Sequence, residues 1–178
     1  MKKASMIKYA AAFVLIFAAA LSRLVPHLPN FTPLAAIALF GGFYLDKKFA
    51  LVAPLAAMLV SDYFIGFSSD SMFVYGSLLA IGAMALAMQH RKSALVVAGT
   101  TLAGSVLFFV VTNFGIWATQ TWYPRTAAGL VECFTMALPF FRNTVAGDAF
   151  YVAAMFGIYE AVLMFADKAD VKTVRVSA

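Results

Sequence analysis

The feature that most constrains this chain is a series of long apolar stretches almost free of charged residues. The clearest covers residues 94–118, which hold no Asp, Glu, Lys or Arg. A helix needs about 20 such residues to cross the hydrocarbon core of a bilayer. Charged residues make up 12% of the chain and the mean hydropathy is +0.89, whereas a typical soluble domain is roughly 25% charged. The sequence therefore predicts an integral membrane protein.

The apolar stretches divide the chain into six predicted spans. We expect a single integral membrane domain over residues 1–178, folded as an all-α bundle of six transmembrane helices. The expected spans cover approximately residues 9–24, 32–45, 49–67, 72–88, 94–118 and 145–165. The second span is short, so either the preceding loop extends it or it enters the membrane only partly. Residues 119–144 form the longest expected non-spanning stretch, with a short apolar piece at residues 130–141.

The basic residues indicate which ends of the spans face the cytoplasm. If the N-terminus lies inside, the outer side holds only Arg23, Arg125 and Arg142 of the 13 Lys and Arg residues. The others fall inside, namely Lys2, Lys3, Lys8, Lys47, Lys48, Arg91, Lys92, Lys168, Lys172 and Arg175. Membrane proteins carry such an excess of Lys and Arg in their cytoplasmic loops. We therefore expect a multi-pass protein of the bacterial inner (cytoplasmic) membrane, with both termini in the cytoplasm.

The charge pattern has two other interpretations. The net charge of +5 does not indicate nucleic-acid binding, because the basic residues lie in short clusters between apolar runs; the expected surroundings are the lipid bilayer. Lys2 and Lys3, followed by an apolar run and three alanines ending at Ala20, also fit a cleaved secretory signal. Its removal would leave five spans.

Polar and aromatic residues gather at the predicted outer ends of the spans. The polar set is Arg23, His27, Asn30, Asp62, Asp70, Asn113, Arg125, Glu132, Arg142, Asn143 and Asp148, with aromatic neighbours that include Phe31, Trp117, Trp122 and Tyr123. A few polar groups set among aromatic surface are typical of a small-molecule pocket. The alternative is an interfacial belt, where Trp and Tyr gather without binding a ligand.

Two of these residues have a structural explanation as well as a functional one. Asn113 lies within an apolar span, where an amide bonds a neighbouring helix or contacts a ligand. Asp62 lies near the outer end of the third span, where it pairs with Arg23 or Arg142, or holds an amine or hydroxyl of a ligand. The sequence leaves both alternatives open.

Three further features are equally open. Asp148 begins the predicted last span, so its carboxylate either favours the helix N-terminus or contacts a ligand. Glu160 is an intramembrane carboxylate, which is a functional candidate by default, unless it faces water at the inner interface. Residues 26–33 contain three prolines, which exclude regular helix and predict a stiff loop. This loop is either a plain connector or a lid over the pocket.

Enzymatic signatures are missing from the sequence. It has no H-E-x-x-H helix and no glycine-rich phosphate loop, and His27 and His90 fall on opposite sides of the membrane in the predicted topology. The lone Cys133 excludes an internal disulfide. We therefore expect no catalytic residues, no cofactor and no metal site.

Three segments carry a resemblance to known proteins: SRLVPHLPNFTPLAAIALFGG, TNFGIW and GLVECFTMALPFFRNT. They resemble an uncharacterised bacterial membrane family allied to the substrate-binding S-components of energy-coupling factor (ECF) vitamin transporters. The resemblance implies a vitamin or related micronutrient bound near the outer face. It also implies Asn30 and Phe31 in a lid, and Asn113, Trp117 and Arg142 around the pocket.

The resemblance also implies partners. S-components dock onto a transmembrane coupling subunit driven by ATPases, through small residues on their first span, and some act alone. Here the first span carries Ala10-Ala11-Ala12 and Ala18-Ala19-Ala20. A cobalamin-transporting group ligates cobalt through a cysteine, which gives Cys133 one conceivable ligand.

Together these observations predict a substrate-binding subunit for micronutrient uptake. The predicted contacts are Asn30, Phe31, Asp62, Asn113, Trp117, Trp122, Tyr123, Arg142 and Asp148. One alternative is a non-catalytic envelope assembly protein that uses the outer polar cluster as an interface. The other is a small intramembrane enzyme that uses Asp62, Glu132 or Asp148 on a lipid.

Overall fold

The chain folds into helices connected by short loops, in a computed structural model that describes residues 2–176 and the side chains of residues 5–166. The helices are α1 (Lys2–Ser22), α2 (Leu34–Tyr44), α3 (Val52–Ile65), α4 (Ser71–Met88), the 3-10 turn η1 (Gln89–Arg91), α5 (Ala94–Thr119) and α6 (Ala127–Val176). The described residues contain no strand. The expectation of an all-α protein is confirmed.

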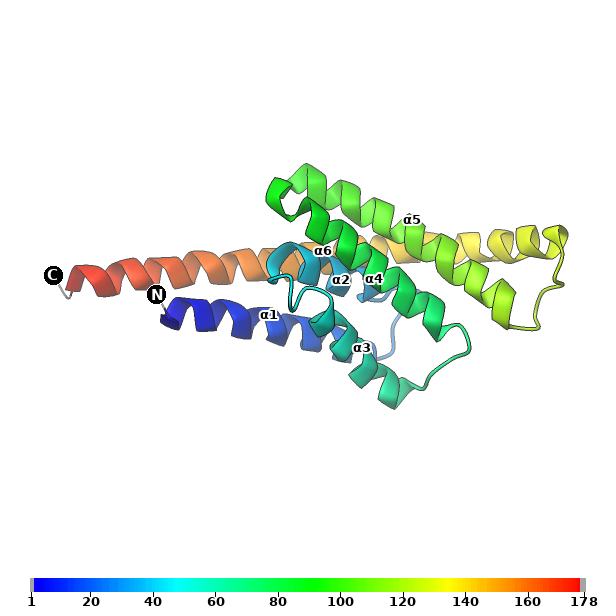
Figure 1. Ribbon diagram of the computed structural model, residues 1–178, viewed down its shortest axis with the longest axis horizontal. Coiled ribbons are helices and arrows are strands. Elements are labelled where there is room, and N and C mark those ends of the chain that lie inside the picture. The colour runs from blue at the N-terminus through cyan, green and yellow to red at the C-terminus, as the bar shows by residue number, and fades with distance from the viewer. Residues whose placement is uncertain (1, 177–178) are drawn as a thin grey trace.

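The helices run alternately in opposite directions along one axis. Figure 1 shows both chain ends and the α4–α5 connection towards one end of the bundle, which we term the terminal end. The α3–α4 and α5–α6 loops lie at the opposite, distal end. Of the basic residues counted above, Lys2, Lys3, Lys168, Lys172 and Arg175 lie outside the residues whose side chains are described.

Helix α2 occupies the centre of the bundle and packs against α1, α3, α4, α5 and α6. Every residue from 35 to 43 is buried, because this segment is apolar on all of its faces. Its carbonyl end is satisfied by Gln89, whose side-chain amide donates to the carbonyls of Phe43 and Leu45 at 3.3 and 3.1 Å. With only 11 residues, or about 16 Å, α2 is too short to cross a bilayer by itself.

The contact between α2 and α4 depends on glycine. A Cβ on Gly42 would lie 2.5 Å from the carbonyl oxygen of Gly82 and 2.6 Å from Cβ of Ala85. A Cβ on Gly82 would lie 2.7 Å from the side chain of Leu51. Gly42 therefore lets the backbones of α2 and α4 approach closely, as small residues do in membrane bundles.

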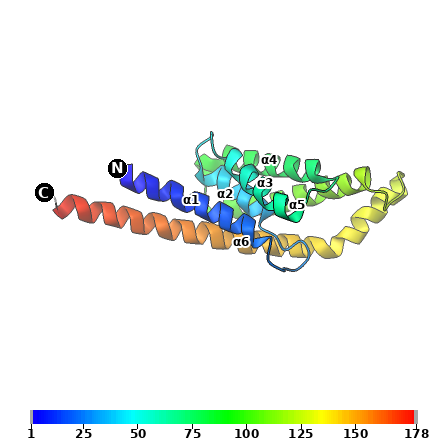
Figure 2. The same ribbon diagram turned by 90° about the horizontal axis from the view of Figure 1, so that it is seen from below.

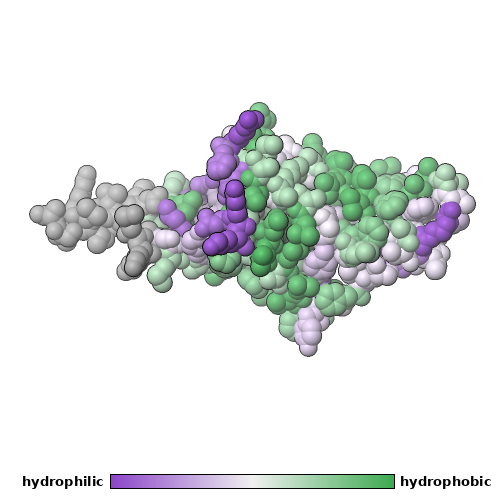
Figure 3. All heavy atoms as spheres, in the orientation of Figure 1, coloured by the Kyte–Doolittle hydropathy of each residue, from purple (hydrophilic) through white to green (hydrophobic). Residues whose placement is uncertain are grey.

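Four helices, α1, α4, α5 and α6, are long and apolar enough to cross a membrane, while α2 and α3 are shorter apolar helices. Large apolar side chains face outward, among them Val14, Leu95 and Phe165, each more than half exposed. Figure 3 shows an apolar surface over the body of the molecule, with hydrophilic patches towards its two ends. Such a surface is suited to contact with lipid.

Helix α6 differs from the expected last span of residues 145–165. It begins at Ala127, so the apolar piece at residues 130–141 belongs to it and the expected interruption before residue 145 is absent. Pro139 lies inside this helix, and Figure 2 shows that α6 bends in its yellow part, towards the distal end. A proline removes one backbone hydrogen bond and bends a helix. Here Pro139 bends α6 but does not end it.

Candidate ligand-binding site

A cavity of about 220 Å³ lies between the distal halves of α4, α5 and α6, next to the N-terminus of α2. We call it the distal pocket. Its lining residues come from four helices, the α1–α2 loop and the end of the α3–α4 loop: Asn30, Thr32, Leu34, Ala35, Asp70, Val74, Phe108, Thr112, Asn113, Ile116, Thr144 and Asp148. The α5 residues span positions 108–116, which makes the pocket about 12 Å deep at 1.5 Å per residue.

Asp148 forms the floor of the distal pocket. It is only 2% exposed, and the hydroxyl of Ser105 on α5 donates to its carboxylate at 2.6 Å. Among the residues that the structure describes, Ser105 is the one recorded hydrogen-bond donor to this carboxylate. A carboxylate can accept several hydrogen bonds, so Asp148 has unused capacity to accept more. Burial of a carboxylate with a single neutral partner is also costly in an apolar environment.

The loop between α1 and α2 covers one side of the pocket and is held on α6. The side-chain amide of Asn143 donates to the carbonyl of Pro29 at 3.0 Å. The ring of Phe31 packs against Phe150 and Tyr151, with centroids 5.7 and 5.9 Å apart. A Cβ on Gly147 would lie 3.1 Å from Cα of Phe31, so a small residue is needed there.

This loop has the non-helical conformation expected from its prolines over residues 26–33. Within it Asn30 has a φ of 60°, a left-handed conformation that asparagine tolerates better than most residues. Asn30 lines the pocket while its neighbour Phe31 is turned to α6. The lid role itself stays a prediction.

Three predicted contacts, Asn30, Asn113 and Asp148, come together in the distal pocket. The amide of Asn113 donates to the carbonyl of Phe109 in its own helix at 2.7 Å, so its nitrogen does not bridge to another helix there. For Asp148, the expectation of a position at a helix N-terminus is wrong. It lies well inside α6, because that helix begins at Ala127.

Asp62 lies outside the pocket lining. It accepts a hydrogen bond from Arg23 at 2.6 Å and another from the hydroxyl of Tyr75, while Arg23 also donates to Ser61 at 2.6 Å. This buried cluster ties the end of α1 to α3 and α4. Of the two alternatives for Asp62, the geometry favours the structural one.

The other predicted contacts lie towards the distal end, also outside the lining. The indole nitrogen of Trp117 donates to the carbonyl of Pro124 at 2.9 Å, and the Arg125 guanidinium lies 5.7 Å from the Trp117 ring centroid. Trp122 and Arg142 are exposed, and Tyr123 is half-buried. As ligand contacts these four residues, like Phe31 and Asp62, stay predictions.

Several lining residues were not among the predicted contacts. Thr112 and Thr144 lie beside predicted residues, and Thr144 is one helical turn from Asp148. This spacing would predict Thr144 as a lining residue if the last helix were expected to begin before residue 145. Asp70 precedes α4 and makes no side-chain capping hydrogen bond, so its carboxylate is available at the pocket mouth.

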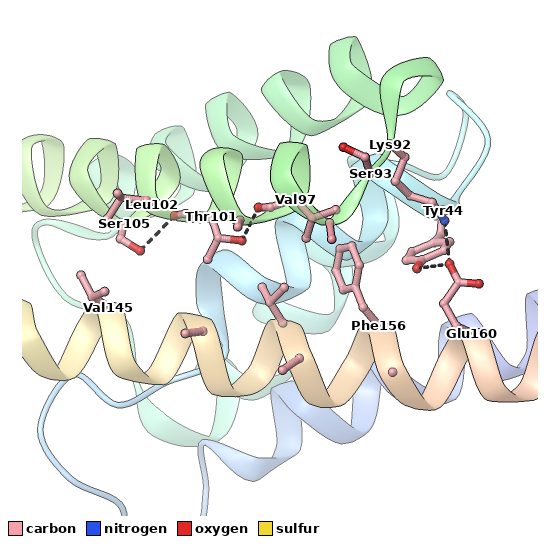
Figure 4. A pocket seen from close by; sticks show the side chains of 16 residues that line it. Tyr44, Lys92, Ser93, Val97, Thr101, Leu102, Ser105, Val145, Phe156 and Glu160 are labelled. Atoms are coloured by element: carbon pink, nitrogen blue, oxygen red, sulfur yellow. Dashed lines mark hydrogen bonds and ion pairs between the residues drawn. The ribbon is translucent and has the colours of Figure 1, made fainter.

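A second, larger cavity of about 750 Å³ is a groove between α5 and α6 that runs from mid-bundle to the terminal end. Its lining is mostly small and apolar and includes Ala98, Leu102, Ala149 and Ala153, all of which are exposed. Figure 4 shows its two ends, with Ser105 and Val145 at one and Lys92, Tyr44 and Glu160 at the other.

The terminal end of this groove is closed by an ion pair. The Lys92 ammonium lies 2.8 Å from Glu160, and the Tyr44 hydroxyl donates to the same carboxylate at 2.6 Å (Figure 4). Lys92 also lies 3.9 Å from the centroid of the Tyr44 ring. Glu160 is therefore partnered and half-buried, which accounts for a carboxylate at this depth.

The two cavities differ in what they can bind. The groove offers apolar surface that lipid chains can cover, whereas the distal pocket combines carboxylates, amides and hydroxyls with apolar walls. Such a mixture orients a small polar ligand. Cys133 is buried, with its sulfur 3.5 Å from the carbonyl of Asn113. No group of three His, Cys, Asp or Glu residues suited to a metal occurs in the described part of the chain.

The long apolar helices, the lipid-facing surface and the polar cavity among the helices define a helical membrane protein. The chain belongs to a family of unknown function (DUF6580), whose model matches residues 3–171. No curated protein and no solved structure matches the chain.

Proposed function

We propose that this protein is a substrate-binding transport subunit, similar to an S-component, that binds a vitamin or related micronutrient in the distal pocket. The observation that carries the proposal is the small cavity between apolar helices, where Asn30, Asn113 and Asp148 converge from separate segments. Polar and ionisable groups inside a membrane are costly and are usually retained for function.

The proposed orientation puts the distal pocket on the outer side of the inner membrane. Lys47, Lys48, Arg91 and Lys92 lie in the connections on the terminal side of the bundle, and basic loops face the cytoplasm. All six apolar helices then lie within the membrane, with α2 enclosed by protein. The ligand enters from outside under the α1–α2 loop.

Delivery of the ligand requires movement of helices or of the whole bundle. Since the sequence carries no nucleotide-binding motif, the energy comes from a transmembrane coupling subunit and its ATPases. Ala10 and Ala18 lie on the exposed face of α1, where small residues permit close approach of another helix.

The test is mass spectrometry of small molecules released from protein purified in mild detergent. Thr112→Phe places a bulky ring in the distal pocket, and we expect it to remove a compound that the wild-type protein holds at about one per chain. Thr135→Phe is the matched control, because Thr112 and Thr135 each donate to a carbonyl of their own helix at 2.7 Å. Thr135 is exposed on α6, away from the pocket.

Two outcomes would contradict the proposal. One is a bound compound that survives Thr112→Phe unchanged. The other is wild-type protein that holds no compound, even after incubation with a mixture of vitamins. The second outcome would favour an envelope assembly protein, whose polar distal end contacts another protein.

A further inference from the structure

Most of the charged and hydroxyl groups that line the distal pocket offer hydrogen-bond acceptors. The hydroxyls of Thr112 and Thr144 donate to carbonyls of their own helices, those of Phe108 and Phe140, at 2.7 and 3.3 Å. A hydroxyl has one proton, so while these bonds are kept the two oxygens act as acceptors towards a ligand. Asn113 already uses one amide proton on its own helix, and its side-chain oxygen has no recorded donor among the described residues.

The carboxylates extend this imbalance. Asp148 at the floor receives one hydrogen bond, from Ser105, and Asp70 at the mouth makes no side-chain cap. Each ionised carboxylate accepts several hydrogen bonds and donates none. The pocket thus presents acceptors at its floor, along its walls and at its mouth.

Positive charge does not balance these two carboxylates. No Lys, Arg or His lines the pocket among the residues that the structure describes. The nearby basic side chains are engaged or directed elsewhere: Arg23 pairs with Asp62, Arg125 lies over Trp117, and Arg142 is exposed. A cation bound beside the two carboxylates would favour the ionised form of both aspartates, which together then carry a formal charge of about −2.

The donors of the pocket carry no full charge: they are the amides of Asn30 and Asn113, the hydroxyl of Thr32 and the N-terminus of α2. Leu34 and Ala35 of its first turn line the pocket, and the preceding Pro33 makes no side-chain capping bond. The first N–H groups of a helix have no partner within it, and the dipole adds roughly +0.5 charge. That partial charge is smaller than the charge on the aspartates, but it offers donors to an acceptor group on the ligand.

We infer that the ligand of the distal pocket is a small organic cation whose N–H groups donate to Asp148 and the surrounding acceptors. This inference rests on the proposed binding function and names its substrate class. A cation at the floor supplies the counter-charge that Asp148 lacks, and an acceptor elsewhere on the ligand meets the N-terminus of α2. Val74, Phe108 and Ile116 provide apolar walls for its carbon skeleton.

The volume limits the size of this cation. A cavity of about 220 Å³ equals the space of about seven water molecules, so the bound part has on the order of ten non-hydrogen atoms. A bare metal ion would leave most of this space and the apolar walls unused. It would also find only two carboxylates, fewer than tight all-protein cation sites supply.

Three probes of nearly identical shape test the charge preference: benzamidinium, which is cationic; benzamide, which is neutral; and benzoate, which is anionic. Binding is measured by isothermal titration calorimetry on the full chain in lipid nanodiscs, after endogenous ligand has been washed out. We expect benzamidinium to bind at least about tenfold more tightly than benzamide, because hydrogen bonds to a charged partner are the stronger ones. We expect benzoate not to bind.

Variants locate the effect. Asp148→Asn keeps the size of the side chain and an oxygen for Ser105, and should abolish the preference for benzamidinium over benzamide. Asp70→Asn, at the more exposed mouth of the pocket, should reduce the preference for benzamidinium. It provides the test if Asp148→Asn does not fold. Glu132→Gln removes an exposed carboxylate of α6, the helix that carries Asp148. This variant should leave the preference for benzamidinium unchanged.

The outcomes separate this inference from the proposed function. Equal binding of the three probes, tighter binding of benzoate, or no binding of any probe at about 10 mM would overturn the cation assignment. So would release of a neutral or anionic compound in the mass-spectrometric experiment, although the binding role would then stand. A benzamidinium preference that Mg²⁺ abolishes by competing for the carboxylates would assign the pocket to a metal ion instead.

Discussion

Two aspartates of the distal half, Asp62 and Asp148, have opposite surroundings. Asp62 is neutralised by Arg23 and receives a further hydrogen bond from Tyr75. Asp148 has the hydroxyl of Ser105, and none of the described residues places a cation beside it. The first arrangement is a completed structural contact, and the second is one that a ligand can complete.

The Arg23–Asp62 pair makes a prediction about stability. The two side chains are 13% and 9% exposed, and removal of one partner of a buried pair costs roughly 3–5 kcal/mol. We therefore expect Asp62→Asn to lower the apparent melting temperature of the detergent-purified protein clearly, as followed by intrinsic fluorescence. The double variant Arg23→Met, Asp62→Leu should lose less than Asp62→Asn alone. A wild-type melting temperature for Asp62→Asn would refute the structural role.

For individual residues, the sequence predicts the chemical character of the pocket better than it predicts which residues line the pocket. Asn113 is identifiable because a polar group inside an apolar helix stands out, and Asp148 because a carboxylate begins the predicted last span. Trp122 is a predicted contact because of its residue type, and Trp117 because of its residue type and the family resemblance. Trp117 instead bonds within the α5–α6 connection, and Trp122 is exposed. An aromatic residue is favoured at a membrane interface and in a pocket alike, so residue type alone could not separate these positions.

Among the elements, α2 and α4 have the most demanding contact. Gly42→Ala would place its Cβ 2.9 Å from the backbone nitrogen of Leu86, besides its contacts with Gly82 and Ala85. These atoms can give way only if the helices separate, so we expect a loss of about 1–3 kcal/mol or more. Thermal unfolding in detergent would measure it.

The control for this substitution lies on α4 itself. Gly76 has no heavy atom within 4 Å of a built Cβ, and alanine is favoured over glycine inside a helix by about 0.5–1 kcal/mol. Gly76→Ala should therefore leave stability unchanged or raise it. Equal effects of Gly42→Ala and Gly76→Ala would mean that the α2–α4 distance is not set by glycine.

The helices were predicted well where apolar residues run without interruption. The expected span of residues 94–118 corresponds closely to α5 (Ala94–Thr119), whose start is fixed by Ser93 accepting from the Val96 amide. The beginning of α6 could not be predicted, because polar residues and Pro139 interrupt the apolar pattern before residue 145. Tertiary contacts with α5 support this helix despite the local signals against it.

For the whole molecule, the proposed orientation is open to a labelling test. In a Cys133→Ser background, Thr121→Cys places a thiol in the exposed distal loop, and Lys48→Cys places one in the α2–α3 connection. A membrane-impermeant maleimide should label position 121 in spheroplasts, and position 48 only after permeabilisation, because basic loops face the cytoplasm. The reverse pattern would invert the topology, and labelling of both from outside would contradict six crossings.

The central position of α2 has a consequence for how the protein is made. A helix of 11 residues falls short of the roughly 17–25 that let a segment remain in the bilayer on its own. Most of its cover comes from α4 and α6, which leave the ribosome after it. The middle of the bundle must therefore be completed late in synthesis, when the last helix closes over a segment that lipid alone cannot retain. A chain interrupted before α6 would expose that segment to quality-control proteases.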